Sequence, residues 1–118
     1  MPDTPSIKLN PLQARTLVIL QELARSPETS STRSEDGEVL ITNFPHIHGD
    51  HFHVGGAVVA ARDATGLQNE SVWKALERKG LAKSMFPLGI ALTKAGVGFV
   101  TGVEDRVLLR VPHHHHHE

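Results

Sequence analysis

The chain of 118 residues contains no cysteine, no tyrosine and only one tryptophan. The absence of cysteine excludes disulfides, thiol nucleophiles and cysteine-ligated zinc, and it fits a reducing cytosol. With four phenylalanines besides the tryptophan, aromatic side chains are too few for a single-strand nucleic-acid binder built on base stacking. We therefore expect a cytoplasmic protein.

Long apolar runs are also missing. No stretch of about 18 residues is apolar enough to cross a membrane, and the opening MPDTPSIKLN lacks the apolar segment of a secretory signal. The length suits one domain with one modest core, which we assign to residues 1–112. The ending HHHHHE, at 113–118, resembles a purification tag; a natural tail is the alternative.

Charge of one sign does not dominate, because the net charge is −1 with neutral histidines. The distribution is uneven, however. Residues 56–94 carry six basic and three acidic side chains, a net charge of +3, whereas residues 26–38 carry four acidic and one basic, a net charge of −3. This asymmetry permits a phosphate-facing surface in the second half of the chain without requiring one.

Three segments have helical patterns. The residues Asn10–Gln13, NPLQ, could form a capping box with proline at the first helical position, and they predict a helix over 11–25. Apolar residues spaced three apart predict a short helix at 57–65 that Gly66 closes, and a second helix follows at 69–79.

The remaining segments predict strands and a loop. Residues 38–44, EVLITNF, are apolar and β-branched and predict a strand. Residues 26–37 contain no hydrophobic side chain and predict a mobile polar loop. Two short strands at 81–85 and 88–92 predict a hairpin, and 107–111 predicts a late strand or extended tail.

The order of helix, glycine turn, helix and hairpin resembles the winged helix-turn-helix of bacterial transcriptional regulators. The resemblance is carried by Ala60–Leu67 (AARDATGL), Ser71–Leu81 (SVWKALERKGL) and Ala91–Gly96 (ALTKAG). In that family the sequence KGL ends the recognition helix, and the sequence LTxxG lies where the chain exits the β-hairpin, which is called the wing. The resemblance covers roughly residues 9–100. It implies an α+β winged helix-turn-helix fold with three helices and a C-terminal hairpin wing. The residues around His46 to His53 predict an extra histidine-rich hairpin in addition.

The same resemblance implies a function and a set of residues. In a winged helix the recognition helix enters the major groove of double-stranded DNA, and the hairpin touches backbone or minor groove. We expect a small regulator or accessory protein, acting as a homodimer. Bases would be read by Gln68 and Asn69, and phosphates would be neutralised by basic side chains. The full set of expected DNA contacts is Gln68, Asn69, Ser71, Lys74, Arg78 and Lys83.

Two features favour other interpretations of this region. Glu70 and Glu77 bring negative charge to the helix that would meet phosphate, so its basic residues could form only a solvated face. The hairpin loop at 85–89, MFPLG, has no lysine or arginine at its tip. An apolar wing favours a protein partner instead of DNA, which makes a protein-interaction module the alternative function.

Four histidines stand close together in PHIHGDHFH, at His46, His48, His51 and His53. The pattern HxHxDH matches the metal-binding signature of metallo-β-lactamase-like hydrolases. That fold needs further ligands downstream and roughly twice this length. The chain also has no GxSxG, no phosphate loop and no dinucleotide fingerprint. We therefore expect no enzymatic activity.

A hairpin explains the four histidines more simply. If Gly49-Asp50 is a two-residue turn, His48 pairs with His51 and His46 with His53, and all four imidazoles share one face. Three imidazoles about 5 Å apart could bind Zn²⁺ or Ni²⁺ and make the hairpin a metal-responsive switch. The alternative is an amphipathic hairpin with a solvated histidine face. We expect no required cofactor.

Overall fold

Helix α1 (Pro11–Arg25) begins at the capping box that its sequence predicts. The side-chain oxygen of Asn10 accepts a hydrogen bond from the Gln13 backbone N–H at 2.7 Å, and the Gln13 side-chain oxygen accepts one from the Asn10 N–H at 3.1 Å. Residues 16–24 are all buried, polar ones included. A helix buried on every side lies in the core of a domain, and the rest of the chain packs around α1.

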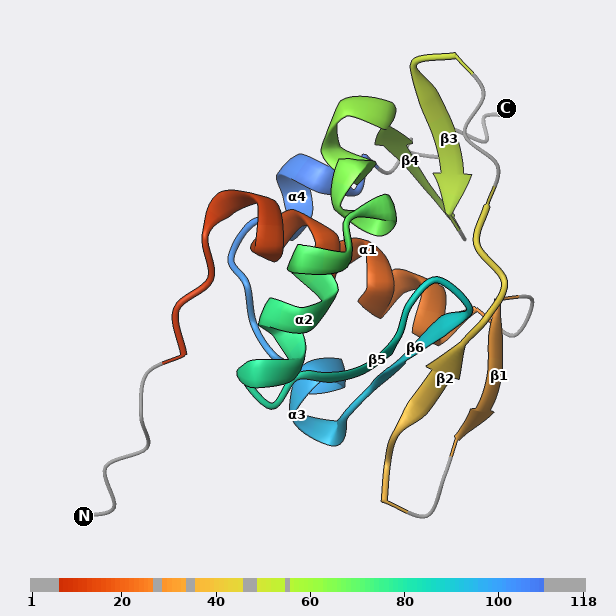
Figure 1. Ribbon diagram of the computed structural model, residues 1–118. Helices are drawn as coiled ribbons and strands as arrows, with labels where there is room; N and C mark the ends of the chain where they lie inside the picture. Colours follow the sequence, from red (N-terminus) through yellow and green to blue (C-terminus); the bar gives the residue numbers. More distant parts are fainter. Residues whose placement is uncertain (1–6, 27–28, 34–35, 46–48, 55, 110–118) are drawn as a thin grey trace, which may run out of the picture.

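The structure is a computed structural model that describes residues 7–26, 29–33, 36–45, 49–54 and 56–109. These residues form a small α+β domain (Figure 1). After α1, the elements in chain order are β1 (Ser30–Arg33), β2 (Val39–Ile41), β3 (His51–Val54), β4 (Ala57–Ala60), the 3-10 helix η1 (Ala61–Gln68), α2 (Glu70–Arg78), β5 (Ala82–Met85), β6 (Gly89–Leu92), α3 (Lys94–Gly98) and α4 (Glu104–Val107). In the described ranges, no helix has the length and hydropathy needed to span a bilayer.

Four strands form an antiparallel sheet in the order β1-β2-β6-β5. Strand β2 comes before both β3 and η1 in the chain, yet it pairs with β6, with Val39 opposite Leu92 and Ile41 opposite Ile90. These four apolar side chains are buried, and both strands contact α1. The β2–β6 pairing therefore fixes the β5–β6 hairpin against the core.

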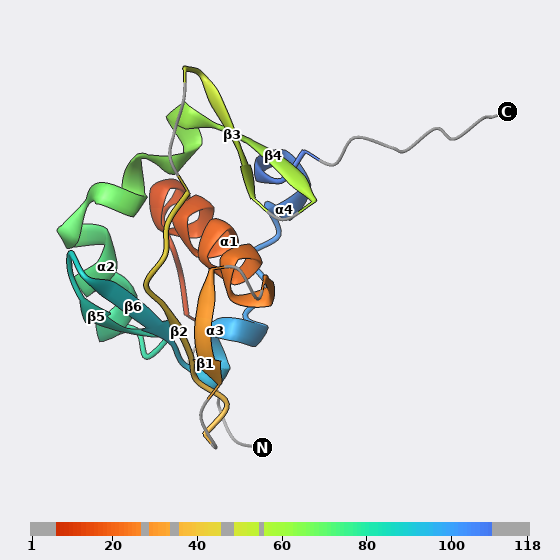
Figure 2. The ribbon, with the colours of Figure 1, turned by 90° about the vertical axis from the view of Figure 1, so that its right-hand side faces the viewer.

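Strands β3 and β4 form a separate antiparallel hairpin. Figure 2 shows α1 in the middle of the molecule, with this hairpin and α4 at one end and the four-stranded sheet at the other. Phe52 and Val54 of β3 and Val59 of β4 face the core, whereas His51 and His53 alternate with them and are exposed. Alternation of this kind follows from the period of two in a strand.

Several predictions about the elements are confirmed. The first helix has the predicted bounds, α2 lies within the predicted 69–79, and β5 and β6 lie within the predicted hairpin strands. The strand predicted at 38–44 is present but shorter, as β2. In these segments the hydrophobic periodicity and the residues that begin or end a helix or strand predict the same element.

The segment predicted as a helix at 57–65 is instead strand β4 followed by η1. Val58 and Val59 are β-branched, and β4 pairs along its whole length with β3, so tertiary pairing overrides the three-residue spacing of the apolar side chains. Gly66 does not close a helix either, because η1 continues through it to Gln68. The backbone becomes extended only at Asn69, with φ −116° and ψ 104°.

The loop predicted at 26–37 contains strand β1, which pairs with β2 at the edge of the sheet. A strand at the edge of a sheet pairs through its main chain and does not need apolar side chains. The polar composition of this segment therefore gave no sign of a strand. The late strand or extended tail predicted at 107–111 is confirmed only in part: Val107 ends α4, whereas Leu108 is extended and Leu109 makes an isolated bridge to Val58. The described part of the chain has four α-helices and one 3-10 helix, more than the predicted three.

The histidine hairpin differs from its prediction in its pairing. Strand β3, which carries His51 and His53, pairs with β4, so that His51 lies opposite Ala60 and His53 opposite Val58. Gly49 has φ +66°, as a glycine at the first turn position requires. The predicted partners His46 and His48 lie outside the described residues.

Candidate nucleic-acid interface

Helix α2 has one buried face and one polar face. Val72, Trp73, Ala75 and Leu76 are buried, and the side chains at the other positions of the helix are exposed. The exposed set is Glu70, Ser71, Lys74, Glu77 and Arg78. An amphipathic helix of this kind is held by its apolar face and presents its polar face to solvent.

Both ends of α2 are fixed by local contacts. At the start, the Asn69 side-chain oxygen accepts a hydrogen bond from the Ser71 N–H at 3.0 Å. At the end, Gly80 adopts φ +78°, a left-handed conformation that suits glycine. The N–H groups of Gly80 and Leu81 then bond to the carbonyls of Glu77 and Leu76, each at 3.0 Å. The chain turns there into β5.

The β5–β6 hairpin lies beside α2 (Figure 1), and α2 contacts β5 directly. The Trp73 ring of α2 packs edge-on against Phe86 in the hairpin loop, with the ring centroids 4.8 Å apart. At the hairpin tip, Leu88 is 78% exposed and Met85 is 45% exposed. The polar face of α2 and an apolar hairpin tip therefore belong to one packed unit.

Five of the six expected DNA contacts are exposed in the structure: Gln68, Ser71, Lys74, Arg78 and Lys83. Asn69 is half-buried, and its side-chain oxygen is used by the cap. A paired contact to adenine needs both the oxygen and the nitrogen of the amide. As Asn69 is placed here, its side chain starts the helix and has no free pair of atoms for a base.

Carboxylates accompany two of the three expected phosphate ligands. Lys74 Nζ lies 3.4 Å from Glu70 Oε2, one turn earlier on α2. Lys83 Nζ lies 2.6 Å from Glu38 Oε2, and the hydrogen bond and charge of Glu38 raise the pKa of Lys83. In the described ranges, Arg78 forms no ion pair. Exposed ion pairs are weak, so phosphate could replace either carboxylate.

The histidine segment presents two imidazoles and one carboxylate. The rings of His51 and His53 are 5.8 Å apart and nearly perpendicular, and Asp50 Oδ1 lies 3.1 Å from His51 Nδ1. The hydrogen bond from His51 lowers the pKa of Asp50. Among the residues that the structure describes, no group of three or more potential ligands could hold a metal ion. Because His46 and His48 are not among them, the predicted zinc or nickel site stays a prediction.

No protein-family model matches the chain, and neither does any curated protein or solved structure.

Proposed function

We propose that the chain binds double-stranded DNA as a winged helix-turn-helix module, in the role of a small transcriptional regulator or accessory protein. The observation that carries this proposal is the polar, exposed face of α2 beside the β5–β6 hairpin. The pairing of β2 with β6 supports it, because it holds the hairpin in a fixed position relative to α2. A rigid support is what a recognition helix needs to keep its side chains in register with base edges.

The dimensions of α2 suit the major groove, which admits one α-helix. Its nine residues extend about 13 Å, which corresponds to about four base pairs. Gln68 and Ser71 would meet base edges near the start of α2, and Lys74 and Arg78 would meet phosphates. Lys83 of β5 would add a phosphate contact from the hairpin.

A homodimer belongs to this proposal. On α2 the charges of Glu70 and Glu77 offset those of Lys74 and Arg78, so one copy has little net attraction for the phosphate backbone. Two copies on two half-sites would combine their contacts on one DNA molecule, which raises the affinity beyond that of a single module.

The test is a titration of the full chain against a fluorescent mixed-sequence duplex at several salt concentrations. We expect the affinity to fall with salt, and the double variant Lys74→Ala/Arg78→Ala to reduce the magnitude of the log–log slope by about two. Arg106→Ala is the control, because Arg106 is exposed on α4, and α4 and the four-stranded sheet lie at opposite ends of the molecule (Figure 2). Absence of binding at the lowest salt would refute DNA binding.

The exposed hairpin tip favours one second candidate, a protein-interaction module. Leu88 and Met85 present apolar surface at the end of a supported hairpin, and such side chains gain most from burial against another protein. Self-association measured by analytical ultracentrifugation, with Leu88→Ser as the variant, tests whether the tip joins two copies. Loss of association without loss of DNA affinity would separate the two surfaces.

A further inference from the structure

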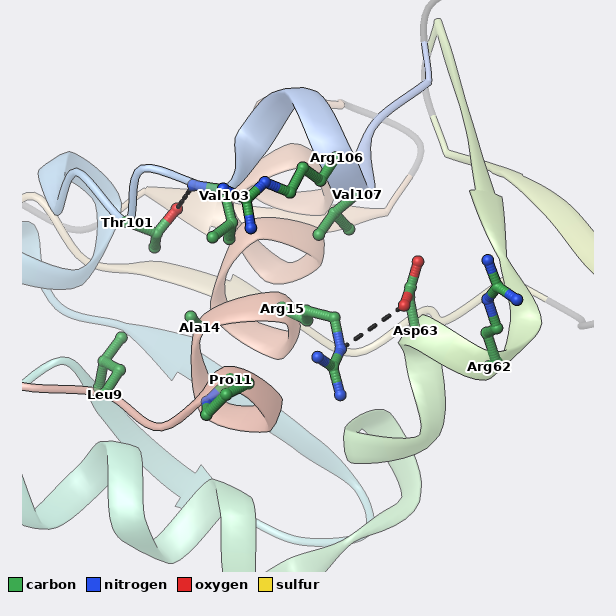
Figure 3. Close-up of a pocket in the computed structure, with 10 residues that line it drawn as sticks. All are labelled: Leu9, Pro11, Ala14, Arg15, Arg62, Asp63, Thr101, Val103, Arg106 and Val107. Carbon is green, nitrogen blue, oxygen red and sulfur yellow. Dashed lines mark hydrogen bonds and ion pairs between the residues drawn. The ribbon is translucent and has the colours of Figure 1, made fainter.

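A cavity of about 460 Å³ lies between the first turns of α1, the start of η1 and α4 (Figure 3). Small-molecule sites in proteins commonly have volumes of about 300–1,000 Å³. The cavity is remote in sequence from α2, because its residues come from three separate segments of the chain. Its charged and hydroxyl-bearing residues are Arg15, Arg62, Asp63, Arg106 and Thr101.

Positive charge exceeds negative charge in this lining, with three arginines against one carboxylate. The carboxylate of Asp63 forms an ion pair with Arg15, whose Nε lies 3.5 Å from Asp63 Oδ1. Figure 3 shows the Arg15 side chain turned toward Asp63, with α4 above it carrying Arg106. In the part of the chain that the structure describes, neither Arg62 nor Arg106 forms an ion pair. The positive charges of Arg62 and Arg106 are therefore not neutralised by a carboxylate of the described residues.

The Arg15 guanidinium has an unusual environment within this lining. Its Nε is buried, and within the described residues this nitrogen has no hydrogen-bond partner, because the approach to Asp63 at 3.5 Å does not make a hydrogen bond. Because this nitrogen is shielded from solvent and faces Asp63, an anion that enters the cavity would meet the terminal nitrogens of Arg15, whose side chain is 33% exposed. A guanidinium presents a planar fork of donors that matches the two oxygens of a carboxylate.

The rest of the lining is mainly apolar. Its side chains are those of Leu9, Pro11, Ala14, Val103 and Val107. Thr101 lies beside them, its hydroxyl oxygen accepts a hydrogen bond from the Val103 N–H at 3.3 Å, and its side chain also hydrogen-bonds to the Glu104 carboxylate. The neighbouring acid Glu104 is turned to the backbone N–H of Thr101 at 3.2 Å and is not part of the lining. Apolar walls with a few charged donors are typical of a site for an organic anion.

We propose that this cavity binds a small organic carboxylate, with its charged group on Arg15 and Arg106 and its apolar body against α1 and α4. Inorganic phosphate would satisfy the arginines and would leave the apolar walls uncovered, so the carboxylate is the better fit. The proposal does not depend on DNA binding, since none of the residues of the cavity lies on α2 or on the β5–β6 hairpin.

The test is an NMR titration of the ¹⁵N-labelled full chain with benzoate, acetate and inorganic phosphate in separate experiments. We expect saturable shifts of the Thr101 and Val103 amides and of the Arg15 Nε–H with benzoate. Because the ring buries apolar surface, benzoate should bind at least about tenfold tighter than acetate. Phosphate binding as tightly as benzoate would overturn the assignment, and so would the absence of saturable shifts with benzoate.

Three variants locate the anion in the cavity. Arg106→Gln should weaken benzoate binding by at least about tenfold, because it removes a charged donor. Asp63→Asn should strengthen it by about two- to fivefold, since it removes the competing carboxylate and releases Arg15. Lys94→Gln, an exposed change on α3 away from the lining, should leave it unchanged. Unchanged affinity in Arg106→Gln would place the anion elsewhere and refute the proposal.

Discussion

The indole N–H of Trp73 donates a hydrogen bond to the backbone carbonyl of Gly66, 3.1 Å away, and so ties α2 to the 3-10 helix that precedes it. Trp73 is 1% exposed, and its ring contacts Phe44 on one side and Phe86 of the hairpin loop on another. One side chain therefore joins the chain before β3, the 3-10 helix η1 and the hairpin loop. The polar face of α2 is positioned by this buried contact.

The first prediction concerns this contact. Trp73→Phe removes the indole donor and leaves a gap where the larger ring was, and we expect a loss of about 2 kcal/mol in the free energy of unfolding. The Gly66 carbonyl still accepts from the Asn69 N–H at 3.2 Å, which limits the loss. Urea denaturation followed by circular dichroism measures it. Arg78→Ala, on the exposed face of the same helix, should change stability by less than about 0.5 kcal/mol.

The second prediction concerns the close approach of Gly66 to α1. A Cβ at Gly66 would overlap the Thr16 hydroxyl, and Thr16 is fully buried with that hydroxyl bonded to the Leu12 carbonyl at 2.8 Å. Since neither helix can give way freely, Gly66→Ala should destabilise the protein by about 1–3 kcal/mol.

Two further variants test this explanation of Gly66. Adding Thr16→Ala to Gly66→Ala should recover part of the lost stability, as expected for two residues in direct contact. Gly98→Ala is the control, because a Cβ there meets nothing within 4 Å. Equal stability of Gly66→Ala and the parent protein in urea would show that the approach is looser than described.

The third prediction is a dependence on pH. Glu104 accepts hydrogen bonds from backbone N–H groups, its own first, and these lower the pKa of its carboxyl group. A carboxyl with a lowered pKa in the folded state contributes stability above its unfolded-state pKa and loses that contribution as the pH falls through the folded-state value. Glu104→Gln should therefore cost about 1 kcal/mol or less at neutral pH.

That cost should disappear in acid. Thermal or urea denaturation at neutral pH and at about pH 3 gives the comparison. Asp105→Asn makes a matched charge change at an exposed position of the same helix and serves as the control. A destabilisation of Glu104→Gln that stays constant over this pH range would argue for a steric cause.

The sequence predicted the elements whose local signals agree, and missed those that depend on distant partners. Asn10 and Gln13 predict the start of α1, and Gly80 predicts the end of α2, because each residue contacts or bends only the backbone within a few positions of itself. The strand at 57–60 was mistaken for a helix because its pairing with β3 is decided by tertiary contacts. Local patterns are weakest where long-range pairing decides the structure.

The same reasoning explains what was missed at the sites. The expected DNA contacts on α2 lie within a few turns and could be named from one helical period. The arginines of the cavity, Arg15, Arg62 and Arg106, lie on three separate elements, and no spacing in the sequence relates them. The cap formed by Asn69 was also missed, although asparagine before a helix is a frequent capping residue.

The fourth prediction concerns the histidines. If His51 and His53 contribute to a zinc or nickel site, His51→Ala/His53→Ala should lower the metal stoichiometry measured by calorimetry. Both proteins should be prepared without residues 113–118, because five histidines there bind metal by themselves. A stoichiometry near zero in the parent protein without that tail would remove metal binding from this segment.

The last prediction rests on the proposed DNA binding and uses the ion pair between Lys83 and Glu38. Glu38 Oε2 lies 2.6 Å from Lys83 Nζ, and the hydrogen bond and charge of Glu38, with a smaller contribution from the charge of Asp36, raise the pKa of Lys83. If phosphate must replace Glu38, Glu38→Gln should raise DNA affinity by about two- to fivefold, because it removes the competitor. Lys83→Ala should lower the affinity, and Glu38→Gln/Lys83→Ala should match Lys83→Ala, since no lysine is left to release.

Fluorescence anisotropy with one duplex measures the affinity of all four proteins, the parent and the three variants. A gain in affinity from Glu38→Gln that persists without Lys83 would assign the effect to general repulsion between Glu38 and DNA.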